Sequence, residues 1–75
     1  MEPDYMVHMA NQIALFFAPY SREEAVAGVA DHLQKFWEPR MRKQIVEYVA
    51  QGGSGLHELA LEAVKRLTIG SRSSS

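Results

Sequence analysis

The stretch that decides the fold is residues 31–42, which read DHLQKFWEPRMR. It contains the only tryptophan of the chain, Trp37, two residues before Pro39. Proline lacks a backbone N–H and its ring clashes with the preceding helical turn, but it suits the first position of a helix. We therefore predict that one helix ends near Trp37 and another begins at Pro39, with Phe36 and Trp37 at the corner between them.

Outward from this corner, the sequence contains four helical patterns and no strand pattern. We therefore expect an all-α fold: one small domain of about four short helices with compact, bundle-like packing and no sheet. The expected helices run from about Pro3 to Phe17, from Ser21 to the corner, from Pro39 to just before Gly52, and from Ser54 to Leu67. Ser21 and Glu24 form a capping-box pattern, and Ser54 is the expected cap of the fourth helix.

Each expected helix has an apolar side, built from residues that recur three or four positions apart. These sides are Met6, Met9, Ala10, Ile13, Phe16 and Phe17; Val26, Val29, Ala30, Leu33, Phe36 and Trp37; Met41, Ile45, Tyr48 and Val49; and Leu56, Leu59, Ala60, Ala63, Val64 and Leu67. On the polar sides we expect the pairs Asp31–Lys35 and Glu62–Arg66. Gly52 suits a left-handed position, and Gly28 leaves a thin spot for the approach of another backbone.

Length and composition indicate a small intracellular domain. The chain has 75 residues, a formal net charge of −1 and no cysteine. A core of this size is marginally stable alone, and disulfides or thiolate metal sites are excluded on this chain. Without a membrane-length apolar run or a signal-peptide pattern, we expect a cytoplasmic protein. Residues 1–69 are expected to form the helical domain, and residues 70–75 a disordered serine-rich tail.

The sequence contains no pattern that indicates catalysis or metal binding. His8, His32 and His57 fall on three different expected helices, whereas zinc requires three or four convergent ligands. The glycine-rich residues 52–55 lack the Gly-Lys-Ser/Thr ending of a phosphate loop, and no serine lies in a nucleophile elbow. We therefore expect no active site, metal or cofactor on this chain.

A polar stripe on the first expected helix is a candidate partner surface. His8, Asn11, Gln12 and Leu15 follow helical spacing and place a leucine among polar residues, which is typical of a helix that a partner contacts. The alternative is an ordinary solvated face with one exposed leucine.

The helix corner provides a second candidate partner surface, formed by Trp37, Pro39, Arg40 and Arg42. Tryptophan and arginine are enriched among binding hot spots, but Trp37 can equally close the end of the core. Arg40, Arg42 and Lys43 also form a short basic run, the one feature that favours nucleic-acid binding. The acidic neighbours and the balanced charge of the chain favour ordinary surface charge, or docking to an acidic partner surface, instead.

Several blocks of the chain resemble a known family, the delta subunit of NAD-dependent formate dehydrogenase. The resemblance is carried by Met9-Ala10-Asn11-Gln12-Ile13 with Phe16-Phe17, by residues 25–32, by Phe36-Trp37-Glu38-Pro39-Arg40-Met41-Arg42, and by residues 52–56 with the last helix. It covers nearly the whole chain except the serine-rich tail.

The resemblance implies a noncatalytic accessory subunit of a cytoplasmic molybdenum- or tungsten-dependent complex. Formate oxidation would occur on the large alpha subunit, which would hold bis-molybdopterin guanine dinucleotide and iron–sulfur clusters, while the beta and gamma subunits would carry electrons to FMN and NAD. The delta chain would support assembly, stability or the cofactor-loaded state of the alpha subunit. The alternatives are a transient maturation factor for insertion of the molybdenum cofactor and a small nucleic-acid-binding domain.

Overall fold

The predicted all-α architecture is confirmed. A computed structural model describes the backbone of residues 2–73 and the side chains of residues 2–67, and this part of the chain contains four helices and no strand. The helices are α1 (Pro3–Phe17), α2 (Arg22–Phe36), α3 (Pro39–Ala50) and α4 (Glu58–Ser73). The first three begin and end within a residue or two of the predicted positions.

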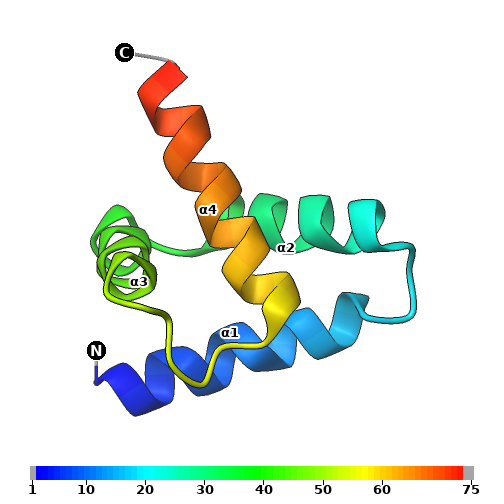
Figure 1. Ribbon diagram of the computed structural model, residues 1–75, viewed down its shortest axis with the longest axis horizontal. Coiled ribbons are helices and arrows are strands. Elements are labelled where there is room, and N and C mark those ends of the chain that lie inside the picture. Colours follow the sequence, from blue (N-terminus) through cyan, green and yellow to red (C-terminus); the bar gives the residue numbers. More distant parts are fainter. Residues whose placement is uncertain (1, 74–75) are drawn as a thin grey trace.

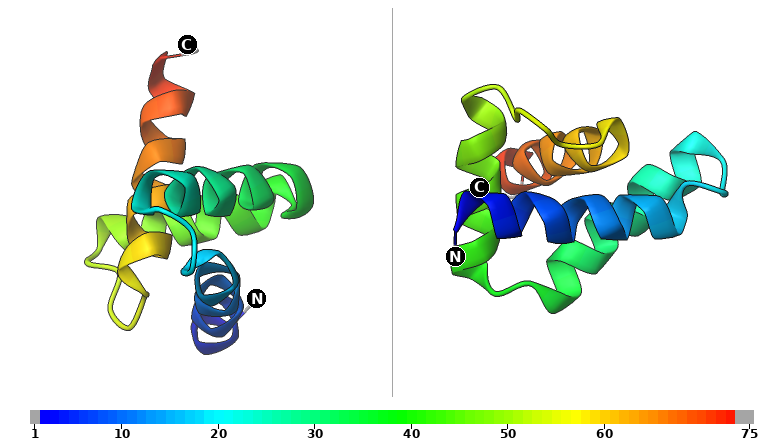
Figure 2. Two further views of the ribbon diagram at one scale, coloured as in Figure 1. Left: turned by 90° about the vertical axis from the view of Figure 1, so that its right-hand side faces the viewer. Right: turned by 90° about the horizontal axis from the view of Figure 1, so that it is seen from below.

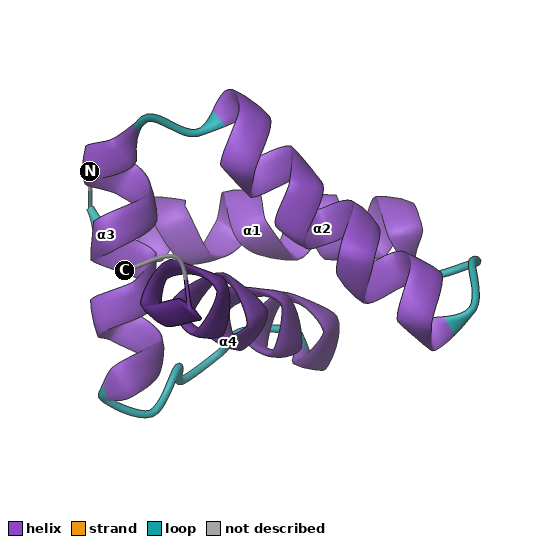
Figure 3. Cartoon of the chain, turned by 90° about the horizontal axis from the view of Figure 1, so that it is seen from above, coloured by secondary structure: helices purple, strands orange, loops and turns teal. Residues whose placement is uncertain are grey.

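The helices are arranged around α4, which crosses the pair formed by α1 and α2 (Figure 1). A short connection at residues 18–21 joins α1 to α2, so the two helices run back along each other. The most extensive helix contact is between α2 and α4, and α3 packs against α4 at the end of the molecule opposite that connection. Figure 3 shows the same order from above, with α1 behind α2 and α4.

The core is built mainly from small side chains where α2 and α4 cross. Six of its fourteen buried residues are alanine, and the largest are Met6, Leu33, Trp37, Ile45 and Leu59. Alanine allows two helix backbones to approach closely, because it adds little volume between them. The predicted apolar sides therefore supply this core, with the exceptions of Phe16 and Phe36, which lie outside it.

The predicted N-cap Ser21 at the start of α2 is confirmed, while the side chain of its capping-box partner Glu24 bonds the Ser21 hydroxyl and not the Ser21 backbone N–H. The backbone N–H of Glu24 donates to the Ser21 hydroxyl oxygen at 3.2 Å, and the Ser21 hydroxyl donates to the Glu24 carboxylate at 2.9 Å. The first bond satisfies one of the backbone donors that a helix start leaves free. The predicted Asp31–Lys35 pair is also present, with a distance of 3.2 Å between carboxylate oxygen and Nζ.

Two glycines end α3, as the sequence predicts for Gly52. The backbone N–H of Gly52 donates to Val49 and that of Gly53 to Tyr48, each at 3.0 Å, which is the bonding pattern of a Schellman motif. Both glycines have positive φ, 124° and 62°, a region that L side chains rarely adopt. Gly53 is also buried, and a Cβ there would lie 2.6 Å from Cδ1 of Leu61.

The start of the fourth helix was predicted wrongly. Helix α4 begins at Glu58, four residues after the expected cap Ser54, and the residue before it is His57. The backbone N–H of Leu59 donates to Nδ1 of His57 at 3.1 Å, so an imidazole takes the capping role that a hydroxyl was expected to fill. Histidine is an uncommon cap, which is why sequence preference alone selected the serine.

The ion pair predicted between Glu62 and Arg66 is also wrong. Glu62 lies 3.4 Å from Arg22 of α2, and Arg66 has no ion pair among the described residues. Because α2 packs against α4, the Glu62 carboxylate pairs with Arg22 of α2 and not with Arg66 of its own helix. The predicted boundary between residues 1–69 and the tail 70–75 stays a prediction, since residues 74 and 75 lie outside the described part of the chain.

Candidate functional site

The predicted stripe on α1 lies on the outer face of the molecule. His8, Gln12 and Leu15 are exposed, and Tyr5 and Phe16 extend the same surface along the helix. We call these five residues the outer face of α1. Leu15 and Phe16 are 55% and 70% exposed, although both are large and apolar. Figure 2 shows α1 in the foreground of the view from below, with no other segment in front of it.

Asn11, the fourth residue of the predicted stripe, holds the chain itself together. Its side-chain amide donates to the carbonyl oxygen of Gly55 at 2.9 Å, and its side-chain oxygen accepts from the backbone N–H of His57 at 2.8 Å. Both partners belong to the connection between α3 and α4. The half-buried Asn11 therefore holds the connection that leads into α4 against α1. Both the NH2 group and the carbonyl oxygen of its side chain are hydrogen-bonded.

Trp37, which the sequence left between core and interface, belongs to the core. Its side chain is only 5% exposed, and its backbone N–H donates to Leu33 at the end of α2. Pro39 and Arg40, the other predicted surface residues of the corner, are exposed at the start of α3. The neighbour Phe36 shows the opposite behaviour, with 72% of its surface exposed, so its predicted place on the apolar side of α2 is wrong.

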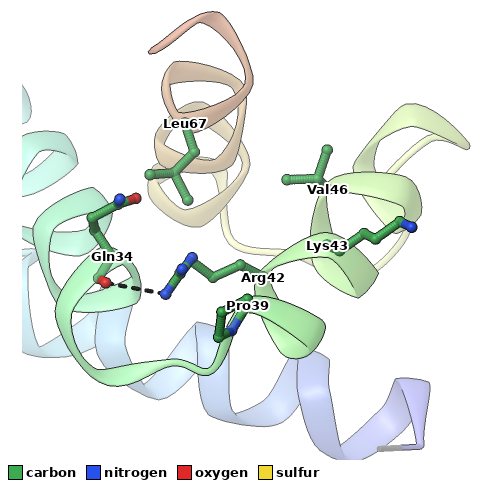
Figure 4. Close-up of a pocket in the computed structure, with 6 residues that line it drawn as sticks. All are labelled: Gln34, Pro39, Arg42, Lys43, Val46 and Leu67. Atoms are coloured by element: carbon green, nitrogen blue, oxygen red, sulfur yellow. Dashed lines mark hydrogen bonds between the residues drawn. The ribbon is translucent and has the colours of Figure 1, made fainter. Parts of the chain in front are cut away.

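Arg42 is directed inward and caps the end of α2. Its guanidinium donates to the carbonyl oxygen of Gln34 at 3.1 Å and to the carbonyl oxygen of Trp37. Figure 4 shows this side chain reaching from α3 toward α2, in a pocket that is also lined by Leu67 and Lys43. A cation at a helix C-terminus satisfies free carbonyl groups and complements the helix dipole. Arg42 thus ties the two helices of the corner together.

An aromatic groove lies between α1 and α2, beside the outer face. It has a volume of about 450 Å³ and is lined by Gln12, Ile13, Phe16, Phe17 and His32. The rings of Phe16 and Phe17 meet edge to face with centroids 5.1 Å apart, and His32 lies against Phe36 at 4.8 Å. Aromatic side chains thus form a continuous surface from α1 to the end of α2.

Gly28 allows this groove to form. A Cβ at that position would lie 2.5 Å from Cε1 of Phe17, so the ring occupies the space that a side chain on α2 would fill. The thin spot predicted at Gly28 is therefore filled by a ring and not by another backbone. Phe17 is half-buried there and separates the groove from the core.

Charge is distributed unevenly over the surface. Residues 5–20 contain no Asp, Glu, Lys or Arg, and the residues that line the groove contain none either. On the α2–α4 side, Arg22 lies 2.6 Å from Glu58, whose hydrogen bond and charge raise the pKa of Arg22 above its ordinary value. The third ion pair of the described residues, Asp31–Lys35, lies on α2 next to His32 and Phe36 in sequence, at the α2 edge of the aromatic groove.

The three histidines do not converge. His8 is exposed on α1, His32 lines the groove from α2, and His57 caps α4. The described residues contain no group of three or more histidine, aspartate or glutamate side chains that could hold a metal ion. No helix of the described part combines the length and the apolarity required to cross a membrane.

The sequence reasoning missed Phe16 and Phe36 as surface residues, although one signal was available for Phe16. On α1 the buried positions are Met6, Ala10 and Ala14, and Met9, Ile13 and Phe17 pack partly buried against the core. The uncharged run 5–20 contains more large apolar residues than one side of a helix can hold, which indicates that some of them face outward.

Comparison with known proteins identifies the family of this chain. A family model described as the NADH-dependent formate dehydrogenase delta subunit FdsD matches residues 5–64, which include α2 and α3 completely and all of α1 except its first two residues. Searches of curated proteins and of solved structures found no match. The resemblance seen in the sequence is thereby confirmed over most of the chain. This chain belongs to the FdsD family, the delta subunits of NADH-dependent formate dehydrogenase.

Proposed function

We propose that this delta subunit is a noncatalytic accessory chain that binds the large alpha subunit and supports its assembly, stability or cofactor-loaded state. The single observation that carries the proposal is the outer face of α1, where Leu15 and Phe16 lie exposed on a helix without formal charge over residues 5–20. Contiguous apolar surface of this kind on a small chain marks a site of protein contact. The complex, and not this chain, would hold the molybdenum or tungsten cofactor, the iron–sulfur clusters, FMN and NAD in the cytoplasm.

The distribution of apolar residues supports a role in binding. Of the seven Phe, Tyr and Trp residues in the chain, only Trp37 is buried, and much of the core is alanine. Alanine buries little apolar area, so the core alone provides limited stabilisation. A chain of this kind gains stability when a partner covers its exposed rings, and by linkage it stabilises the bound form of that partner to the same extent.

The roles of the polar side chains support the noncatalytic part of the proposal. Ser21, Asn11, Arg42 and His57 each satisfy backbone groups at a helix end or in a connection. The described part of the chain contains no buried polar or charged residue, whereas groups that carry out acid–base chemistry usually depend on burial for their reactivity. Arg42 also points inward, so Arg40, Arg42 and Lys43 do not form one exposed basic patch of the kind that favours nucleic-acid binding.

The decisive experiment compares the complex expressed with and without this chain. We expect the alpha subunit purified without it to contain less molybdenum or tungsten, to melt at a lower temperature and to turn over formate more slowly. A complex with unchanged metal content, melting temperature and turnover would contradict the accessory role. Quantitative mass spectrometry of the complete complex separates a permanent subunit, recovered in a fixed ratio to alpha, from a transient maturation factor, recovered in a much lower ratio.

A further inference from the structure

We infer that the outer face of α1, together with the aromatic groove and Phe36, is the surface on which the partner docks, and that its occupant is an uncharged amphipathic helix of a partner subunit. The inference rests on the proposed function, since it requires that this chain bind another subunit. It differs from the surface expected from the sequence, because it assigns Phe16, His32 and Phe36 to the interface and excludes Asn11, Trp37 and Arg42, which serve the fold.

Electrostatics define the chemistry of the occupant. The α1 part of the surface has no formal charge over residues 5–20, and His32 and Phe36 continue it on α2, where the nearby charges of Asp31 and Lys35 are paired with each other. A partner that placed Asp or Glu against these rings would lose the hydration of that charge without gaining an opposite charge. Lys or Arg would recover only part of the same loss through attraction to a ring face. The contacting residues of the partner are therefore apolar, with a hydrogen-bonding group opposite the polar lining residues Gln12 and His32.

The exposed area fits a stable interface. Among the residues whose side chains are described, five large apolar ones are exposed, namely Tyr5, Leu15, Phe16, Tyr20 and Phe36, and four of these lie on α1 or in the connection that follows it. An aromatic side chain can bury about 150–250 Å² in total. Since these residues are more than half exposed, they offer roughly 500 Å² together, a large part of the roughly 800 Å² that each partner contributes to a standard interface.

The backbone determines which secondary structure can dock. Both sides of the surface are helices whose backbone groups bond within the helix, so no strand edge is available for β-augmentation at this site. Recognition must use side chains, and the groove of about 450 Å³ between α1 and α2 accepts side chains that project from a neighbouring segment. A helix with apolar residues three and four positions apart presents such a row, which is the helix-in-groove mode.

A mutational test uses the complete complex, with a tag on the alpha subunit. The variants Phe16→Glu and Phe36→Glu place a charge on the surface from two different helices, and Gln51→Glu adds the same charge at the exposed end of α3. Because the first two side chains are exposed, the isolated variants are expected to keep the melting temperature of the unaltered chain. We expect their ratio to alpha in the purified complex to fall at least tenfold, and that of Gln51→Glu to stay unchanged.

The outcomes separate this inference from the proposed function. If the unaltered chain fails to co-purify with the complex, both are overturned. If it co-purifies and both phenylalanine variants do so in the same ratio, the docking surface is wrong while the accessory role stands. If the isolated chain forms a dimer that Phe16→Glu dissociates, the surface is occupied by a second copy, and the inferred partner helix is overturned.

A cross-linking experiment tests the occupant directly. A photoreactive phenylalanine analogue replaces Phe16 in the complete complex, and mass spectrometry identifies the linked peptides. We expect links to one segment of a partner subunit that has apolar residues three and four positions apart and no charged residue on that side. Links to a charged segment, or to another copy of this chain, would overturn the inference.

Discussion

Both sides of helix α1 carry large apolar residues. Toward the core, α1 presents Met6, Ala10 and Ala14, all buried, with Phe17 packed against the core, and toward solvent it presents Leu15 and Phe16, both more than half exposed. In an ordinary surface helix the large apolar residues face the core and polar residues face water. The departure on the solvent side teaches that α1 has more large apolar residues than its own chain covers, and that Leu15 and Phe16 remain available for another chain.

The contact between α2 and α4 follows the ordinary rule. Ala25 and Val29 of α2 and Ala60 and Ala63 of α4 are completely buried, and Arg22 with Glu58 forms an ion pair on the exposed side. This region therefore has its apolar groups inside and its charges outside. The comparison predicts that inward residues control the stability of the isolated chain, and outward residues of α1 control binding. Neighbouring residues that point in opposite directions provide matched tests.

The largest effect is expected at the helix corner, where Trp37 is buried and Phe36 is exposed. Trp37→Ala removes a large core side chain and is expected to lower the free energy of unfolding by about 3 kcal/mol or more, measured by urea denaturation. Phe36→Ala is expected to change it by less than about 0.5 kcal/mol. Equal losses in the two variants would show that both rings stabilise the chain, and the distinction between inward and outward residues would fail at this corner.

A smaller effect is expected for a change of volume on α1. Ala14→Leu inserts three heavy atoms at a completely buried position and is expected to destabilise the chain by about 1–3 kcal/mol through overpacking. Leu15→Ala, one residue later, removes the same group from an exposed position and should leave the free energy of unfolding within about 0.5 kcal/mol. If Ala14→Leu melted at the temperature of the unaltered chain, the close approach of α1 to the core would be contradicted.

The next test separates a polar residue that serves the fold from one that faces solvent. Asn11→Ala removes the two hydrogen bonds that hold Gly55 and His57, and should cost about 1–2 kcal/mol of unfolding free energy. Gln12→Ala serves as the control, because Gln12 is exposed on the same helix. Hydrogen exchange gives a second measurement, since the amide of His57 should exchange faster in Asn11→Ala and at an unchanged rate in Gln12→Ala.

The smallest effect is expected for the exposed ion pair between α2 and α4. Arg22→Gln should lower the melting temperature slightly at low ionic strength, and the difference should vanish near 1 M salt, where the Debye length is about 3 Å. Lys43→Gln removes a charge of the same sign from α3, outside the ion pairs of the described residues, and should show no such salt dependence. A difference that persists at high salt would assign Arg22 a packing role.

Local chemistry explains why so much of the fold could be predicted. The corner at Pro39, the N-cap Ser21 with its partner Glu24 and the glycine end of α3 each depend on residues within one or two turns of each other. The start of α4 could not be found in this way. Its position depends on Asn11, which is 46 residues from His57 in sequence and reaches its backbone only in the folded chain.

The candidate site was predicted only in part, for a related reason. Helical spacing placed His8, Gln12 and Leu15 correctly on one exposed face, because the period of a helix is a property of the sequence. Spacing could not show that Asn11 faces a connection, that Arg42 turns toward α2, or that Phe36 extends past the core. These outcomes depend on where other helices cross, which the pattern of a single helix does not contain.

The sequence by itself determined the helical class, three of the four helix starts and the family to which the chain belongs, since each depends on short-range patterns and residue identity. Only the tertiary structure decided that Trp37 is core while Phe36 and Phe16 form an aromatic surface. The physical reason is that burial depends on which helices cover a residue. On α1, the other helices cover the side that carries Met6, Ala10 and Ala14, and they leave Leu15 and Phe16 uncovered on the other side.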